Sequence, residues 1–370
     1  MTSSSRGASS SVSVPEPETA NPIAAVAQLR STSDKFRNLV DIAVCAGLAR
    51  AKGASMLFLP ECFGFMGESA AQTLQEAEDP ARLSTSAAED SEDAEALDRI
   101  LKATIASANA SANSNANASS GELPQPGGGR PTVPSLMDGL RIIARESGLW
   151  ISGGGIHVAG APPLDGDEAN PPRVYNTHVV MDSEGTVRAS YRKIHLFDVS
   201  IPGKVELRES KTTAPGTELV VCDSPLGRLG VTICYDLRFP ETYTRLVEEM
   251  GARILLVPSA FTVPTGAAHW HALLRARAIE NQCYVLAAAQ YGIHNAKRDS
   301  FGRSLAVDPW GKILADAGGY PTTEDADAGG LQNGEAPEPP SIVTVEIDLG
   351  LIDSIRERMP IDLHRSNATF

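Results

Sequence analysis

The chain has 370 residues, of which 42% are hydrophobic and 21% charged, and these are ordinary proportions for a folded protein with a large core. Its formal net charge of −14 argues against nucleic acid or an anionic membrane as the main partner. No apolar run approaches the ~18 residues that a membrane-spanning helix requires.

The five cysteines are odd in number, scattered along the chain and free of any C-x-x-C motif. This pattern favours reduced thiols and a cytoplasmic location over a disulfide framework or a zinc site. The N-terminus is rich in Ser and contains one Arg, which gives it some features of a transit peptide, so a mitochondrion or plastid is the alternative location. The seven histidines do not pair at a spacing of four residues, and we expect no metal site.

The first elements follow a disordered tail that we predict over residues 1–20. An apolar run predicts a buried strand over Pro22–Gln28. Apolar residues at helical spacing predict a helix over Asp34–Lys52, with Asp34 as its N-cap and Gly53 closing its end. A short buried strand, Ser55–Glu61, is then predicted to end at a carboxylate.

Residues 78 to about 134 interrupt this pattern. They contain an acidic patch, a short segment with Leu and Ile, and a low-complexity stretch (106–131) that cannot bury enough apolar surface to order itself. Because strand–helix alternation resumes afterwards, we interpret the segment as an insertion within one domain over 21–365. A second long loop is predicted at about 318–340.

After the insertion, predicted strands and helices alternate. Strands are predicted over 149–158, 173–182, 186–193, 228–234, 253–258, 283–289, 304–308, 312–316 and 341–347. Helices are predicted over 135–147, 240–250, 269–281 and 349–358. Many strands are continuous apolar runs and some form hairpins, so the predicted fold class is α/β, with helices covering mixed sheets.

Cys234 stands at the junction between a predicted strand and a helix that has Pro240 in its first turn. Such a junction exposes a side chain at the edge of a sheet, and a helix N-terminus lowers the pKa of a thiol. Catalysis by a thiolate is therefore one interpretation, and a small buried core residue is the other.

Two further strand ends carry groups that a catalytic thiol needs. Glu61 ends the strand 55–61 and is a candidate general base. Arg192 and Lys193 end the strand 186–193, and strand alternation places them on opposite faces, so that one can point inward. Taken alone, Glu61 is better explained as an exposed charge that closes a strand, and Arg192 and Lys193 have the alternative explanation of solvated charges at a strand end.

Three motifs containing these residues occur in order: L-P-E at Glu61, Y-R-K-x-H-L-F-D at Lys193 and G-x-x-I-C-Y-D-x-R-F-P-E at Cys234. Together they resemble the nitrilase superfamily, the carbon–nitrogen hydrolases with a Glu-Lys-Cys triad. The resemblance covers about 21–76 and 135–365. It implies a four-layer α-β-β-α sandwich, a homodimer paired through helices beside the nucleophile, and no metal or organic cofactor.

The resemblance also implies roles for individual residues. Cys234 would attack an amide carbonyl, and Glu61 would transfer protons. Lys193 and the backbone N–H of Tyr235 would hold the oxyanion. Glu209 matches a second family glutamate that positions Lys193 or the substrate.

The local motifs resemble the amidase branch of the superfamily and imply hydrolysis of deaminated glutathione to α-ketoglutarate and Cys-Gly through a thioester. Arg238 is the candidate partner of a substrate carboxylate, although a structural salt bridge is an equal explanation. Phe261 and Thr265 are expected to form a wall of the acyl pocket, and Cys62 is expected to contribute packing.

Several alternatives remain open at this point. The leading one is an ω-amidase that acts on α-ketoglutaramate, followed by another amide or a nitrile as substrate. A non-catalytic scaffold that acts through protein interaction is a third, and a papain-type Cys-His hydrolase is a fourth. The papain type would need a histidine partner for Cys234, which the motif around that residue does not suggest.

Overall fold

The structure, a computed structural model, describes residues 20–84, 91–113, 131–164, 171–201, 205–320 and 339–366. Most of the predicted tail (1–19), the end of the low-complexity stretch (114–130) and most of the second predicted loop (321–338) lie outside the described residues. Within the described ranges, no helix is both long enough and apolar enough to span a membrane.

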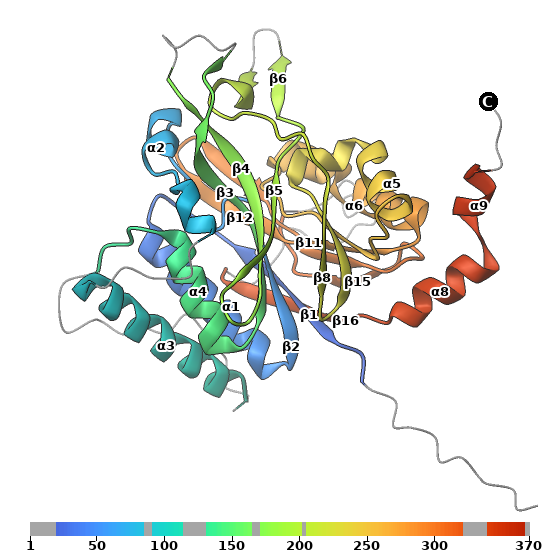
Figure 1. The fold of residues 1–370 in the computed structure, drawn as a ribbon, viewed down its shortest axis with the longest axis horizontal. Coiled ribbons are helices and arrows are strands. Elements are labelled where there is room, and N and C mark those ends of the chain that lie inside the picture. The colour runs from blue at the N-terminus through green and yellow to red at the C-terminus, as the bar shows by residue number, and fades with distance from the viewer. Residues whose placement is uncertain are drawn as a thin grey trace, which may run out of the picture.

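Two β-sheets pack face to face, and helices cover their outer faces (Figure 1). The first sheet has the order β13-β12-β1-β2-β3-β4-β5, and β16 pairs antiparallel with β1. Its strands are β1 (Ile23–Leu29), β2 (Ala54–Leu59), β3 (Trp150–Ala161), β4 (Arg173–Met181), β5 (Val187–Arg192), β12 (Ala289–Asn295), β13 (Arg298–Phe301) and β16 (Ser341–Glu346).

The second sheet has the order β15-β14-β11-β10-β9-β8. Its strands are β8 (Val220–Ser224), β9 (Gly227–Val231), β10 (Ile254–Leu256), β11 (Tyr284–Ala287), β14 (Leu305–Val307) and β15 (Ile313–Asp316). A separate hairpin joins β6 (Asp198–Ile201) to β7 (Val205–Arg208). Both sheets combine parallel and antiparallel pairs, which confirms the prediction of mixed sheets.

The outer layers consist of helices whose apolar residues pack on the sheets. Helices α1 (Lys35–Ala51) and α4 (Leu136–Ser147) cover the first sheet. Helices α5 (Pro240–Glu248) and α6 (Val263–Asn281) cover the second sheet. An apolar core between the sheets completes the four layers of an α-β-β-α sandwich. The described ranges also contain the helices α2 (Ala70–Gln75), α3 (Glu92–Asn113), α8 (Leu349–Arg358) and α9 (Ile361–Ser366).

Local sequence signals set many of the helix ends. The Asp34 side chain accepts a hydrogen bond from the backbone N–H of Arg37 over 2.9 Å, and Gly53 follows α1 with a φ of 70°, as predicted. The predicted start of α6 at residue 269 is wrong by six residues. Its first turns are poor in helix-forming residues, but Gly266 packs so closely on Phe301 that tertiary contact stabilises them.

The insertion is tied to the domain where it begins and ends. The buried carboxylate of Glu78 accepts hydrogen bonds from the Ser135 hydroxyl (2.9 Å) and from the backbone N–H of Leu136 (2.7 Å), at the start of α4. Between these points, α3 packs outside α1 and α4. The described part of the insertion beyond residue 78 does not line the pocket described below.

The prediction that the whole low-complexity stretch stays unordered is wrong for residues 106–113, which continue α3. Ala108 is 9% exposed and lies against Gly47 of α1, where a Cβ atom would come within 2.7 Å of it. Two small residues thus let the helices approach closely, which a composition argument does not detect.

Candidate active site

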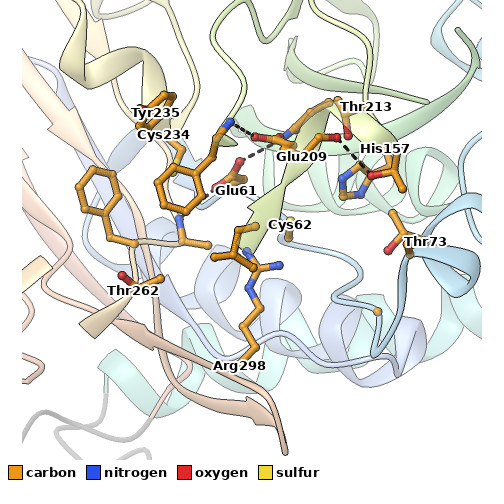
Figure 2. Close-up of a pocket in the computed structure, with 18 of the residues that line it drawn as sticks. Glu61, Cys62, Thr73, His157, Glu209, Thr213, Cys234, Tyr235, Thr262 and Arg298 are labelled. Carbon is orange, nitrogen blue, oxygen red and sulfur yellow. Dashed lines mark hydrogen bonds between the residues drawn. The ribbon is translucent and has the colours of Figure 1, made fainter. Parts of the chain in front are cut away.

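A pocket of about 480 Å³ opens at the carboxyl ends of β2, β5 and β9, where the two sheets meet (Figure 2). All eight residues that the sequence predicted for the site line it: Glu61, Lys193, Glu209, Cys234, Tyr235, Arg238, Phe261 and Thr265. Residues that are distant in the chain meet here because strand ends of a packed sandwich converge at one edge.

Cys234 occupies a sharp turn between β9 and a 3-10 helix, Cys234–Arg238, that leads into α5. Its φ of 47° lies in the left-handed region, which costs a residue with a side chain about 1 kcal/mol or more. The turn is held because the backbone N–H of Cys234 donates a hydrogen bond to the carbonyl of Pro258 over 2.9 Å. The Cys234 side chain is half-buried and lines the pocket, which agrees with the predicted exposure at a strand end.

Glu61 follows β2 and is only 4% exposed. Its Oε1 atom accepts hydrogen bonds from Nζ of Lys193 (3.0 Å) and from the Asn176 side chain (2.9 Å). Its Oε2 atom accepts one from the backbone N–H of Ala260 over 3.1 Å. These donors hold an ionised carboxylate in one orientation, and its charge acts on the thiol of Cys234.

Lys193 follows β5 and is 2% exposed, whereas its neighbour Arg192 is exposed, so the predicted division between the two faces is confirmed. Its Nζ atom lies 3.1 and 3.0 Å from the two carboxylate oxygens of Glu209. Glu209 is itself oriented by the backbone N–H of Phe197, which donates over 2.7 Å. The ammonium group is therefore clamped between the carboxylates of Glu61 and Glu209.

Burial alone favours the neutral form of both groups in the Glu61–Lys193 pair, but their charges outweigh it. The carboxylates of Glu209 and Glu61 raise the pKa of Lys193 well above its ordinary value. The charges of Lys193 and Arg298 hold the pKa of Glu61 below its ordinary value. The resting site thus contains an ionised glutamate and a charged lysine.

The predicted lowering of the thiol pKa is wrong. Burial, and next the negative charge of Glu61, raise the pKa of Cys234 well above its ordinary value, and Lys193 opposes them only in part. The short 3-10 helix is too weak a dipole to reverse this. Cys234 is therefore a neutral thiol at neutral pH, next to a carboxylate that is ready to take its proton.

The other four predicted residues, Tyr235, Arg238, Phe261 and Thr265, also line the pocket. The Tyr235 ring packs edge-on against Phe197. The Arg238 guanidinium lies 5.7 Å from the ring centre of Phe261 and 3.3 Å from Nδ1 of His269. Within the described ranges, no carboxylate pairs with Arg238. Thr265 bonds to the neighbouring Thr262 hydroxyl over 2.8 Å.

Among the residues of the site that were not predicted from the sequence, three support the predicted ones through hydrogen bonds or charge. Asn176 lies in β4 and orients Glu61 from 115 positions along the chain. Asp236, two residues after the nucleophile, is fully buried and bonds to Tyr191 and His195. Arg298 comes from the unpredicted β12–β13 hairpin. Only Asp236 carries a usable signal, since a carboxylate inside the motif around Cys234 needs a partner.

Comparison with known proteins agrees with this architecture. The carbon-nitrogen hydrolase family matches residues 124–357. The human deaminated glutathione amidase is 36% identical over 345 residues, which are 93% of this chain and 82% of that protein. The nitrilase and fragile histidine triad fusion protein NitFhit of Caenorhabditis elegans is 37% identical over 342 residues, or 92% of this chain.

The crystal structure of the C. elegans NitFhit protein superposes with a TM-score of 0.66 at 36% identity, covering 94% of this chain and 65% of that one. The present chain spans 60% of the length of the curated NitFhit sequence. The family match and the amidase relative show that the protein is a hydrolase that acts on carbon–nitrogen bonds. The chain belongs to the carbon-nitrogen hydrolase family.

Proposed function

We propose that this protein is an amidase whose substrate is deaminated glutathione, with Cys234 as nucleophile. One observation carries the proposal: the carboxylate of Glu61 and the ammonium of Lys193 lie 3.0 Å apart, buried beside a cysteine held at a strained turn. The name of the human relative, deaminated glutathione amidase, supports the choice of substrate.

The proposed first half-reaction forms a thioester. Sγ of Cys234 attacks the amide carbonyl carbon while Glu61 takes the thiol proton, which fits a neutral thiol beside an ionised carboxylate. The carbonyl oxygen becomes an oxyanion, stabilised by the Lys193 ammonium and the backbone N–H of Tyr235. Glu61 then gives its proton to the amide nitrogen, the C–N bond breaks, and Cys-Gly leaves as a neutral amine.

The second half-reaction releases the acid. A water molecule attacks the thioester carbonyl while Glu61 takes one of its protons. When the second oxyanion collapses, the C–S bond breaks and Sγ recovers the proton, which leaves α-ketoglutarate and the starting enzyme. In this scheme Lys193 is an electrostatic group and not a base, since the two carboxylates around it keep it charged.

Other interpretations are less well supported by the site. A papain-type enzyme needs a histidine against the thiol, but the charged groups that act on Cys234 are Glu61 and Lys193, and His195 is bonded to Asp236. A non-catalytic scaffold would have no need of a buried Glu–Lys pair, which is costly to desolvate. An ω-amidase would use the same chemistry, and only substrate kinetics separates it from the present proposal.

The deciding experiment compares kcat/KM for deaminated glutathione and α-ketoglutaramate, with α-ketoglutarate release coupled to a dehydrogenase. We expect a strong preference for deaminated glutathione and no turnover by Cys234→Ala. A preference for α-ketoglutaramate would make the protein an ω-amidase. Turnover of deaminated glutathione by Cys234→Ala would overturn the assignment of the nucleophile.

We propose further that the protein is a cytoplasmic homodimer that pairs through its outer helices α5 and α6. Ile279 of α6 and Trp310, in the β14–β15 turn, are large apolar side chains that are 43% and 65% exposed. Gly311 places that turn against Ile279, so the two can belong to one patch. Light scattering on the purified protein and on Ile279→Asp tests the dimer, and imaging of a tagged chain tests the location.

A further inference from the structure

A second positively charged region lines the pocket, separate from Arg238. It consists of Lys297 and Arg298, at the turn of the β12–β13 hairpin, which belongs to the first sheet. Figure 2 shows the Arg298 side chain extending from its strand into the pocket, across from Cys234 and Tyr235. Arg238, in contrast, comes from the 3-10 helix that follows the nucleophile.

The guanidinium of Arg298 has no ion pair or hydrogen bond within the described part of the chain. Two carboxylates of the rim, Glu68 and Asp299, are exposed and do not pair with it either. The charge of Arg298 nevertheless acts inside the pocket. Among the charges that lower the pKa of Glu61, its effect is the second largest, after that of Lys193. An unpaired guanidinium that faces a pocket matches a carboxylate of a ligand.

The proposed substrate has two carboxylates, one at each end. The α-keto acid end belongs to the acyl part, and its partner in this proposal is Arg238, the candidate for a substrate carboxylate, which adjoins Phe261 in the expected acyl pocket. The other carboxylate ends the glycine of the leaving group. A pocket of about 480 Å³ lies within the ~300–1,000 Å³ typical of sites for small molecules and has room for both parts.

We propose that Arg298, aided by the charge of Lys297, binds the terminal carboxylate of the dipeptide leaving group and thereby selects a peptide amide over a primary amide. This inference rests on the proposed function. It makes Arg298 a specificity residue, since α-ketoglutaramate releases ammonia and has no second carboxylate for this guanidinium to bind.

The test is a cycle that changes both partners of the contact. Deaminated glutathione is compared with the same compound bearing a C-terminal carboxamide, using the wild type and Arg298→Gln. In the wild type, we expect the carboxamide to lower kcat/KM roughly 10-fold, mainly through KM, as for a partly exposed charged hydrogen bond. In Arg298→Gln, the two compounds should differ less than 2-fold. Arg298→Lys should restore part of the difference.

The matched control is Arg228→Gln, which removes an exposed arginine of β9 that does not line the pocket. It should preserve the 10-fold difference. An equal difference in the wild type and in Arg298→Gln would overturn the role of Arg298 and leave the proposed amidase intact. The role of Arg298 would also be overturned if Arg298→Gln lowered kcat/KM equally for all substrates, α-ketoglutaramate included, because that pattern reports an effect on Glu61 alone. A wild type that cleaves only α-ketoglutaramate would overturn both.

Discussion

The carboxylate of Asp236 accepts a hydrogen bond from the hydroxyl of Tyr191 over 2.7 Å, although the two residues are 45 positions apart. The same oxygen accepts from the backbone N–H of Ile233 (2.9 Å), and the second oxygen accepts from both the backbone and the ring of His195. Asp236 therefore fastens the turn that carries Cys234 to the segment that carries Lys193.

Replacing Asp236 by Asn should lower kcat more than it raises KM. The amide has one acceptor atom where the site supplies four donors, so buried N–H and O–H groups lose their partners at a cost of about 1–3 kcal/mol. Tyr191→Phe removes only one of these bonds and should cost about 1 kcal/mol. Steady-state kinetics and urea unfolding measure both effects. If Asp236→Asn had the same kcat and the same stability as the wild type, the hydrogen bonds of Asp236 would not position the site.

Replacing Lys193 by Met should lower kcat by roughly 10²–10³-fold, the usual loss when an oxyanion donor is removed. The buried carboxylate of Glu61 would then lose its nearest positive charge, so the pKa of Glu61 should rise and the acid limb of kcat/KM should move to higher pH. Lys312→Met, at an exposed lysine of the β14–β15 turn, is the control and should retain activity. A Lys193→Met enzyme with near-normal kcat would favour a mechanism of the papain type.

The thiol of Cys234 should stay protonated through neutral pH. Because burial and the Glu61 carboxylate raise its pKa, thiolate absorbance near 240 nm should be absent from the difference between wild type and Cys234→Ala until the pH is well above the ordinary thiol value of 9.0. A titration step between pH 5 and 8 would contradict this.

Glu61 should remain an ionised base over the same range, because its pKa is lowered. The acid limb of kcat/KM should therefore appear only when the pH falls below the ordinary carboxyl value of 4.5.

His178 should make the protein less stable in mild acid. Its Nδ1 atom bonds to the Thr232 carbonyl (2.9 Å) and its Nε2 atom to the Ser152 hydroxyl (2.7 Å), in the core where the sheets meet. Burial lowers its pKa from 6.5 to about 4, so the unfolded chain binds the proton first and the free energy of unfolding falls as the pH decreases through 6.5 toward 4.

The size of this effect follows from the pKa difference. Between pH 7 and pH 5, His178 should account for about 2 kcal/mol of the loss in the free energy of unfolding. Urea unfolding of wild type and His178→Gln at the two pH values isolates that share, because His294, whose pKa is also about 4, is present in both proteins. Identical pH dependence in the two proteins would mean that His178 does not titrate as its burial requires.

Gly154 should not tolerate a side chain. In β3, a Cβ on Gly154 would lie 2.1 Å from the Leu59 carbonyl oxygen and 2.3 Å from Cβ of Pro258. Gly154→Ala should lower the free energy of unfolding by about 1–3 kcal/mol and impair activity, because Pro258 supports the turn at Cys234. Gly148→Ala is the control for activity: a Cβ there meets nothing within 4 Å, so kcat should be retained, although the φ of 68° makes the substitution cost about 1 kcal/mol of stability.

The sequence by itself determined the elements and the main residues of the site. Apolar runs and helical periodicity predicted most strands and helices, and Glu61, Lys193 and Cys234 were each recognised at a strand end within a short motif. These signals are local, because the apolar run of a strand and the polar residue that ends it are neighbours in the sequence. The α-β-β-α arrangement followed from the resemblance that the three motifs carry.

Only the tertiary structure decided the electrostatics of the site and the identity of its supporting groups. Asn176 and Glu61 are 115 positions apart, and Arg298 enters through a hairpin that the pattern did not predict. The thiol of Cys234 was expected to be acidic from its place before a helix, yet its pKa is raised. The physical reason is that burial and charge–charge energies depend on distances in space, which the order of residues along the chain does not specify.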